Sequence, residues 1–504
     1  MNKIRLIIFH LLFIIVAILL FINGLYPENN TIQPTVFPES SSSEFSDYNA
    51  KPDQNNKSKN INLDMQALYG IQYKQLFSGF SLSQERNTFV YLLTSKFNRS
   101  GDFGYNDETY VNSGYYENNL GLTVNWNWTD TKLIIEGEAD NESRGMFNND
   151  VYSREEKSNN KISAKTIYKL SPSAEVFFSM GGAWYNHSLI AIDPSDLVRS
   201  RLIQGNFKAG GEYVWSASNR MRLNTDFLYY DYIPKEVESD RHFKAEIIDD
   251  FNVSRNIGVS IGVGYINNKD DKSIKIPVPY SISLSLKEYK YLACIFLYKF
   301  DIVPFRAEEF YLKQKYINPT YNLPPGSVHT GEIKTESRLN SILELKGNFK
   351  IEKNNNFYNY VPVNGNVLSA DTLEVVSYNP GVEANISVLK KIWEIALTYN
   401  YFYFDAEKNI TYIPDHEAAG IIRFNSKNWK IEWTNKLRGK VRSNPDTNEK
   451  IPEAFIGSLG IQRKMLEGSY FYGKFENLYN SRYTIRKSYP EPGISFLMGL
   501  RILI

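Results

Sequence analysis

The chain has almost no cysteine and almost no net charge. Its 504 residues include one cysteine, Cys294, so no disulfide can form within the chain and no cysteine metal cluster is possible. Lysine and arginine total 57 against 56 aspartates and glutamates, which leaves a formal net charge of +1. There is therefore no basic field to attract nucleic acid, and we expect no nucleic-acid partner. Cys294 is expected to be a small apolar side chain in a strand.

Catalytic motifs are also lacking. The five histidines are scattered, without an HExxH motif or a nucleophile–base grouping, and we interpret them as polar residues of loops or strand ends. We expect neither an enzyme nor a bound cofactor. Acidic loop residues, among them Asp102, Asp107 and Glu108, are candidate calcium ligands, but none of these clusters has EF-hand spacing. Solvated loop charge is the preferred interpretation.

Only one apolar run in the chain is long. Lys3 and Arg5 precede LIIFHLLFIIVAILLFI, and the chain turns polar at Asn23, which is typical of an export signal over residues 1–24. An uncleaved membrane anchor is the alternative, because the run is long and has no clear small-x-small cleavage site. Residues 25–59 are rich in Ser, Asn, Pro and Lys and are predicted to be a disordered linker.

Apolar and polar residues alternate along much of the chain with a period of two, which is the side-chain period of a β-strand. Residues 61–70 place Ile, Leu, Met, Ala and Tyr on one face. Similar runs of about ten residues are joined in hairpins around short turns, such as 129–130 and 254–256. Long hydrophilic loops are expected at 99–114, 140–160 and 301–335. The last strand is apolar at every even position from Ile494 to Ile504.

Short turns that alternate with long loops are typical of an outer-membrane barrel, with the short turns in the periplasm and the long loops outside the cell. The chain is rich in aromatic residues, with 36 tyrosines, 30 phenylalanines and seven tryptophans, and these gather at strand ends in runs such as WNW, FLYYDYI and YNYFYF, where membrane girdles require them. At roughly 20 residues per strand and connection, residues 60–504 give about 22 strands. We predict an all-β, transmembrane, antiparallel β-barrel; a soluble β-sandwich array or propeller is the alternative.

One row of residues is predicted to face the inside of this barrel, and it carries both signs of charge. Such a row gives a hydrated interior without strong ion selectivity. Its members are Lys132, Glu136, Glu138, Arg222, Asp226, Lys436, Arg438 and Lys440.

Sequences at four places in the chain resemble, in the same order, those of TonB-dependent outer-membrane receptors of the cobalamin and siderophore type. Near the C-terminus, ENLYNSRY followed by YPEPG resembles their "NLFD..Y" and "YP.PGR" elements. Further upstream, FRAEEF followed by NPTYNLPPG resembles "FRAPT…NP.L.PE", and between these places YNPGVEANI and YIPDHEAAGIIRF resemble two of the family's strands. The residues that match are Phe305, Arg306, Asn318, Pro319, Gly381, Glu383, Asn477, Leu478, Tyr483, Pro490, Pro492 and Gly493. Ile494 and Ile504 depart from the family's arginine and terminal aromatic residue.

The resemblance implies a function in transport. It implies an outer-membrane barrel that imports a large, scarce nutrient and meets outer-membrane lipid, the barrel assembly machinery and the TonB system. Such receptors also contain a globular plug, for which residues 25–59 are too few, so we expect the plug to be absent or supplied by a separate polypeptide. A plugless, porin-like diffusion channel and a surface binding or structural barrel are the alternatives.

Overall fold

The computed structural model describes residues 61–503, with gaps at 71–72, 87, 106–107, 148, 194, 196, 217–218, 234–239, 269–277, 290–291, 305–315, 319–322, 339–341, 364–366, 390–391 and 488. The chain divides into two compact units, residues 1–34 and 35–504, and only the second contains described residues. The signal and linker predicted for residues 1–59 therefore lie outside the described residues. Within the described residues, no helix has the length and hydropathy of a membrane span.

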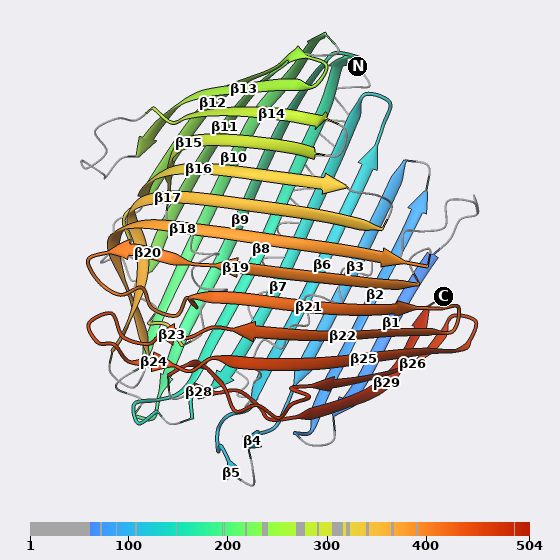
Figure 1. Ribbon diagram of the computed structural model, residues 1–504, viewed down its shortest axis with the longest axis vertical. Coiled ribbons are helices and arrows are strands. Elements are labelled where there is room, and N and C mark those ends of the chain that lie inside the picture. The colour runs from blue at the N-terminus through green and yellow to red at the C-terminus, as the bar shows by residue number, and fades with distance from the viewer. Residues whose placement is uncertain are drawn as a thin grey trace. The chain divides into compact units, whose positions relative to one another are not determined.

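One antiparallel sheet forms a closed ring (Figure 1). Its first half consists of β1 (Ile61–Gly70), β2 (Gln75–Arg86), β3 (Phe89–Arg99), β6 (Tyr115–Asn127), β7 (Thr131–Gly145), β8 (Tyr152–Ser171), β9 (Ala174–Ala191), β10 (Val198–Ser216), β11 (Asn219–Ile233), β12 (Asp240–Ser254) and β13 (Ile257–Asn268). The second half consists of β14 (Tyr280–Tyr289), β15 (Leu292–Val303), β16 (Gly326–Arg338), β17 (Leu343–Pro362), β18 (Leu368–Val388), β19 (Trp393–Tyr401), β20 (Tyr403–Ala406), β21 (His416–Asn425), β22 (Trp429–Arg438), β25 (Ala454–Leu466), β26 (Ser469–Glu476) and β29 (Ser495–Leu503).

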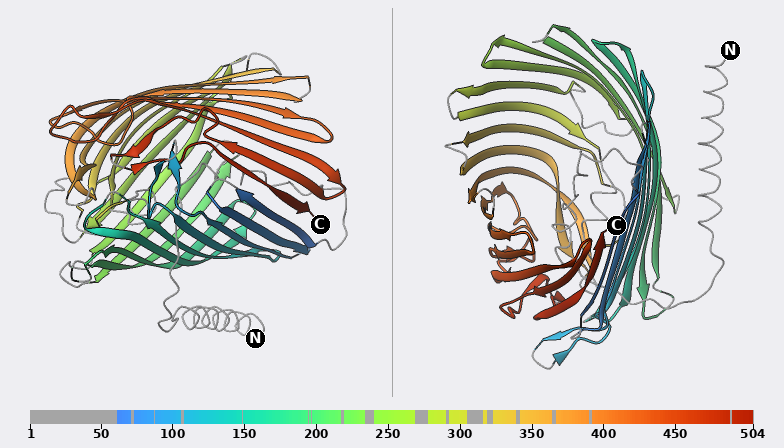
Figure 2. Two further views of the ribbon diagram at one scale, coloured as in Figure 1. Left: turned by 90° about the horizontal axis from the view of Figure 1, so that it is seen from below. Right: turned by 90° about the vertical axis from the view of Figure 1, so that its right-hand side faces the viewer.

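The ring contains 22 strands, as the sequence predicts. β19 and β20 are two halves of one strand interrupted at Phe402, because both pair with β18. Every neighbouring pair is antiparallel, and β1 pairs with β29 to close the ring. Figure 2 shows the curled sheet from two further sides. Three small hairpins lie in the connections: β4 (Gly104–Tyr105) with β5 (Glu108–Thr109), β23 (Val441–Arg442) with β24 (Lys450–Ile451), and β27 (Thr484–Arg486) with β28 (Tyr489–Pro490).

The connections confirm the predicted asymmetry. At one end of the barrel, ten connections have two to four residues; we call this the short-turn end. At the other end the connections have four to 22 residues, and we call it the long-loop end. Because β1 begins and β29 finishes beside the short turns, both ends of the barrel sequence lie at the short-turn end.

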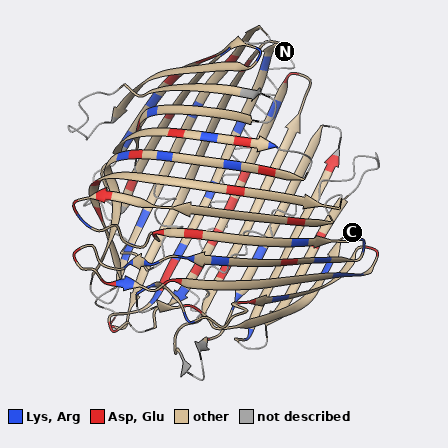
Figure 3. Ribbon diagram, in the orientation of Figure 1, with Lys and Arg blue, Asp and Glu red and all other residues tan. Residues whose placement is uncertain are grey.

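The two faces of the sheet differ in chemistry. Apolar side chains project outward and remain exposed, among them Phe207, Val382 and Leu500 at 46%, 61% and 54%. The inward faces carry ion pairs that link neighbouring strands, such as Lys161 to Glu138 at 3.3 Å and Arg501 to Asp64 at 2.6 Å. Figure 3 shows both signs of charge on the strands. An apolar exterior and a charged interior reverse the arrangement of a soluble sheet and suit a lipid environment.

The strands extend further than the sequence predicts, because the barrel strands reach 21 residues rather than about ten. The predicted loop 140–160 is wrong: β7 continues to Gly145, β8 begins at Tyr152, and six residues connect them. Both faces of this segment are polar, so alternation of hydropathy is lost, but the ladder continues through side-chain pairs such as Asn159 with Asp140 at 3.1 Å. The predicted loop 301–335 shortens to 304–325, because β15 continues to Val303 and β16 begins at Gly326.

Candidate functional site at the long-loop end

The long-loop end contains the most deeply buried part of the molecule. One cluster of buried apolar side chains draws its members from six connections and the end of β9: Tyr73, Phe103, Met146, Phe147, Leu189, Tyr316, Val367 and Tyr489. Edge-to-face contacts between aromatic rings hold it together, for example Phe103 with Phe147 at 5.4 Å between centroids. These connections start from strands in many places around the ring, so their packing holds distant parts of the rim together.

A buried carboxylate fixes one of these connections to the wall. Glu155, on the inward face of β8, is 1% exposed. It lies 3.2 Å from Nζ of Lys157 and 3.0 Å from Nε2 of His187, which is on β9. We call these three residues the Glu155 cluster. A buried charge is tolerated only when it is paired and hydrogen-bonded, and these neighbours meet that requirement.

Glu155 also binds the backbone of the longest connection. The backbone amides of Tyr316 and Ile317 donate to the two carboxylate oxygens of Glu155, at 2.9 and 3.3 Å. Tyr316 adopts a positive φ of 57°, which turns both amides toward the same carboxylate. We call Tyr316, Ile317 and Asn318 the inner segment.

The other side of the inner segment pairs with the opposite part of the ring. Ile317 forms a parallel bridge with Leu368, where β18 begins. The amide of Leu368 donates to the carbonyl of Tyr316 at 2.8 Å, and the amide of Asn318 donates to the carbonyl of Leu368 at 2.6 Å. β8 is the sixth strand of the ring and β18 the sixteenth. The inner segment therefore connects the sixth and the sixteenth strands of the 22-strand ring.

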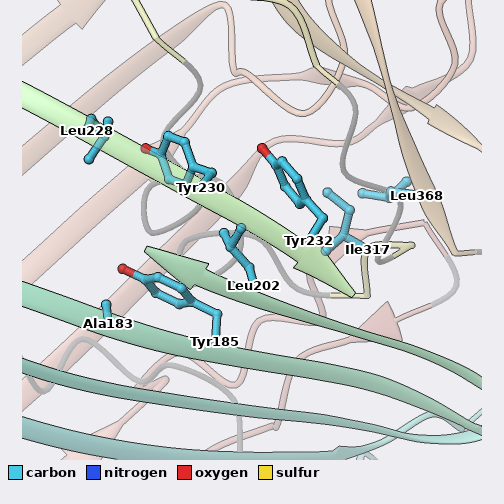
Figure 4. Close-up of a cluster of buried hydrophobic side chains, with 8 residues drawn as sticks. All are labelled: Ala183, Tyr185, Leu202, Leu228, Tyr230, Tyr232, Ile317 and Leu368. Carbon is cyan, nitrogen blue, oxygen red and sulfur yellow. The ribbon is translucent and has the colours of Figure 1, made fainter. Parts of the chain in front are cut away.

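Apolar packing supports the same bridge. Figure 4 shows Ile317 and Leu368 beside Tyr232 of β11, with Tyr185 of β9 and Leu202 of β10 in the same cluster. Ile317 is fully buried. The ring of Tyr316 stacks on that of Tyr489 at 3.9 Å between centroids. Burial raises the pKa of Tyr489 to about 12 and that of Tyr316 above its usual range, so both rings stay neutral.

A cavity of about 590 Å³ opens on the inner side of the late strands. Its lining is polar and of both signs: Lys436 and Arg438 of β22 lie beside Glu417 of the neighbouring β21, and Glu476 of β26 also lines the cavity. This confirms the predicted inward orientation of Lys436 and Arg438. The cavity could hold a polar molecule or water, and its charges do not select one sign.

The C-terminal motif residues build the wall of this cavity. Asn477 is buried with a positive φ of 47°, and its Nδ2 donates to the carbonyls of Ser481 and Pro492, each at 2.9 Å. Its Oδ1 accepts from the amide of Ser481 at 2.9 Å. Tyr483 and Gly493 also line the cavity. Asn477 therefore fixes the connection between β26 and β29.

The remaining motif residues are spread through the barrel. The amide of Leu478 donates to the carbonyl of Gly457 at 2.8 Å, and Pro490 pairs with Thr484 in the β27–β28 hairpin. Glu383 of β18 lies 3.2 Å from Nζ of Lys346. Gly381 stands on β18, and Asn318 belongs to the inner segment. Phe305, Arg306 and Pro319 lie outside the described residues.

Within the described residues, the structure does not bring the candidate calcium ligands together. Asp102 accepts from the amides of Ser113 and Gly114 at 2.8 and 3.0 Å, which stabilises its own connection. Asp107 and the side chain of Glu108 lie outside the described residues. Where the structure describes the chain, no group of three or more His, Cys, Asp or Glu side chains is placed to hold a metal ion.

Sequence reasoning missed the Glu155 cluster. Glu155 and Lys157 fall in a polar run, SREEKSNN, that has the composition of a loop, and His187 is one histidine of five. Glu155 and Tyr316 are 161 residues apart, so no local pattern connects them. The only available signal was the alternation of charge at positions 155 and 157, which continues the inward face of β8.

Comparison with known proteins gives matches in structure alone. No family model matches the sequence, and neither does any curated protein. The copper transporter OprC superposes with a TM-score of 0.69 at 10% identity, over 89% of this chain and 80% of that one. The FrpB iron transporter from Neisseria meningitidis (F3-3 variant) gives 0.69 at 9% identity, over 89% and 82%. The siderophore receptor PirA from Acinetobacter baumannii gives 0.70 at 9% identity, over 89% and 81%.

These matches confirm the predicted fold. The chain forms an all-β, closed, antiparallel barrel of 22 strands that matches the barrels of TonB-dependent receptors. At 8 to 10% identity the likeness concerns the fold and not the ligand.

Proposed function

We propose that this chain is an outer-membrane transport barrel that imports a large, scarce nutrient in the manner of TonB-dependent receptors. The observation that carries the proposal is the 22-strand barrel with an apolar exterior and a charged interior, similar over 89% of the chain to solved transporters and a siderophore receptor. The long-loop end then faces the outside of the cell and the short turns face the periplasm. Export by the signal in residues 1–24 and insertion by the barrel assembly machinery belong to the same proposal.

The nutrient is proposed to be siderophore-like or cobalamin-like in size. Its arrival at the long-loop end would displace the inner segment, which otherwise connects β8 with β18. The plug is proposed to be supplied by a separate polypeptide, and the TonB system would supply energy by acting on it. Residues 25–59, rich in Ser, Asn and Pro, offer too little apolar surface to fill a barrel of this width.

A plugless diffusion channel is the second candidate. It is favoured by the interior, where lysine and carboxylate side chains alternate, as in Lys208 with Asp226 at 3.3 Å and Lys244 with Asp301 at 2.9 Å. Such a surface is hydrated and passes solutes of either charge. A surface binding or structural barrel is the third candidate, and it would use only the loops.

Reconstitution and copurification separate the candidates. The chain is purified from its native outer membrane and reconstituted in planar bilayers. Import is supported by a plug-sized polypeptide that copurifies and lowers the current when it is added back. A large, stable current in a preparation without any such partner supports the diffusion channel. Recovery of the chain as a soluble protein after cell fractionation contradicts all three candidates.

A further inference from the structure

Arginines gather on the outward face of the barrel near the long-loop end. Arg199 and Arg201 are exposed on β10, and Arg241 is exposed on β12. The outward direction of Arg199 and Arg201 follows from the alternation of β10, where Ser200 and Leu202 are buried toward the inside, and that of Arg241 from the buried His242 beside it on β12. Two carboxylates of the same face, Glu156 of β8 and Asp231 of β11, lie in the neighbouring strands, so the group is basic overall without being uniformly so.

The partners of these arginines are unusual for this molecule. Nε of Arg199 donates to Oγ of Ser188 at 3.4 Å, and Nε of Arg201 donates to Oδ1 of Asn186 at 2.9 Å. Inside the barrel, by contrast, Arg501 is matched by the carboxylate of Asp64. Among the described residues, neither Arg199 nor Arg201 forms an ion pair with a carboxylate, so neutral groups orient both side chains.

The height of the arginines follows from the length of the strand. On the same outward row of β10, Ile203 to Trp215 covers 12 steps, which is about 40 Å along a strand and about 28 Å in height at a tilt of ~45°. That is the thickness of the hydrocarbon core of a bilayer, ~30 Å. Arg201 is the next outward residue beyond Ile203, and Arg199 follows it. Both therefore stand at the level of the lipid headgroups.

Aromatic side chains mark the same level. Arg241 lies over the ring of Tyr229 at 5.9 Å from its centroid, and Tyr229 is paired with Gly205 on β10. Tyr265 of β13 is 51% exposed on the same outward face. Aromatic rings of this kind occupy the boundary between hydrocarbon and headgroups, which places the arginines just beyond that boundary.

We propose that Arg199 and Arg201, with Arg241 beside them, bind a phosphate group of a lipid headgroup in the outward leaflet. A guanidinium matches phosphate in charge and in geometry, and the acyl chains of the lipid would lie along the apolar row below, beginning at Ile203. The inference rests on the membrane location in the proposed function. It adds a lipid-binding surface on the outside of the barrel, separate from transport through the interior.

The test uses two lipids that differ only in phosphate. The full chain is purified in detergent, and retention of phosphatidic acid is compared with that of diacylglycerol of the same acyl chains, by mass spectrometry of the intact protein. Wild type is expected to retain phosphatidic acid preferentially. The double variant Arg199→Gln with Arg201→Gln is expected to lower that preference about 25-fold, since each basic residue near anionic headgroups strengthens binding about five-fold.

The matched control removes two arginines from the short-turn end. Arg338→Gln with Arg463→Gln makes the same change in charge where β16 and β25 meet the short turns, and it should leave the preference unchanged. Equal loss in both double variants, or no loss in the first, overturns the proposal. Displacement of the lipid by millimolar inorganic phosphate would assign the site to free phosphate instead. If the wild-type chain does not insert into lipid vesicles, the proposed function itself is contradicted. Failure of the lipid-binding site alone is therefore distinguishable from failure of the proposed function.

Discussion

At the scale of single residues, Glu155 has the greatest influence on the long-loop end. It is buried, it carries charge, and it accepts two backbone amides from a connection that is distant in sequence. Removing one partner of a buried ion pair costs more than the pair itself is worth, because the other charge stays buried without compensation. Lys157 would keep its charge but lose the carboxylate that lies 3.2 Å from its Nζ.

Glu155→Gln is therefore expected to lower the free energy of unfolding of the long-loop end by about 3–5 kcal/mol. It should also release the inner segment, which raises the bilayer current and the rate of proteolysis in residues 304–325. Unfolding of the reconstituted barrel, single-channel current and limited proteolysis measure these effects.

Glu374→Gln is the matched control. Glu374 pairs with Lys353 at 2.6 Å, but its side chain is 61% exposed, and exposed pairs contribute at most about 1 kcal/mol. If both variants behaved alike, Glu155 would not be what holds the inner segment to the wall.

Asn477 gives a second prediction at this scale. Its φ of 47° is the left-handed conformation that glycine tolerates and most residues do not. Asn477→Ala loses three hydrogen bonds and keeps the strain, whereas Asn477→Gly loses the bonds alone. We expect the alanine variant to be less stable than the glycine variant by about 1–2 kcal/mol. Thermal unfolding measures this difference, and equal stability would show that the backbone of residue 477 relaxes.

At the scale of elements, the closing pair of strands leaves no room for a side chain at Gly499. Gly499 of β29 lies against Ala67 of β1, and a Cβ atom placed on Gly499 would overlap the carbonyl oxygen of Ala67. Two heavy atoms cannot occupy the same space, so the strands would have to separate.

Gly499→Val is accordingly expected to prevent closure. The variant should lose the heat-dependent shift in gel mobility by which a closed barrel is recognised. Gly331→Val on β16 is the control, because a Cβ atom at Gly331 meets nothing within 4 Å. A shift that survives in the Gly499 variant would mean that β1 and β29 can pair at a wider spacing.

The elements were predictable wherever one face is apolar and the other polar. β1 has the bounds that alternation predicts, 61–70, and the turn at 255–256 lies within the predicted turn 254–256. The extensions of β7 and β8 were not predictable, because residues 155–160 are polar on both faces and have the composition of a loop. The candidate site could not be predicted at all, since Glu155 and Tyr316 meet only through the closed ring.

At the scale of the whole molecule, the inner segment links β8 with β18 and can be locked there. Ile317 and Leu368 are bridge partners, and such partners lie about 5 Å apart, within the span of a disulfide. Ile317→Cys with Leu368→Cys, in a chain that also carries Cys294→Ser and Glu155→Gln, should hold the inner segment when oxidised. The bilayer current is expected to be low when oxidised and to rise on reduction. If the current is the same before and after reduction, the inner segment does not control the passage of ions through the barrel.

The seam between β1 and β29 has one more consequence, for the order in which the chain folds. Asp64 and Arg501 are 437 residues apart in sequence, so their contact closes a very long loop and we expect it to form late in folding. Until then the sheet has two unpaired edges, which readily recruit strands from other chains and aggregate. We therefore expect aggregation of the nascent chain to depend on how soon the nine-residue strand β29 pairs with β1.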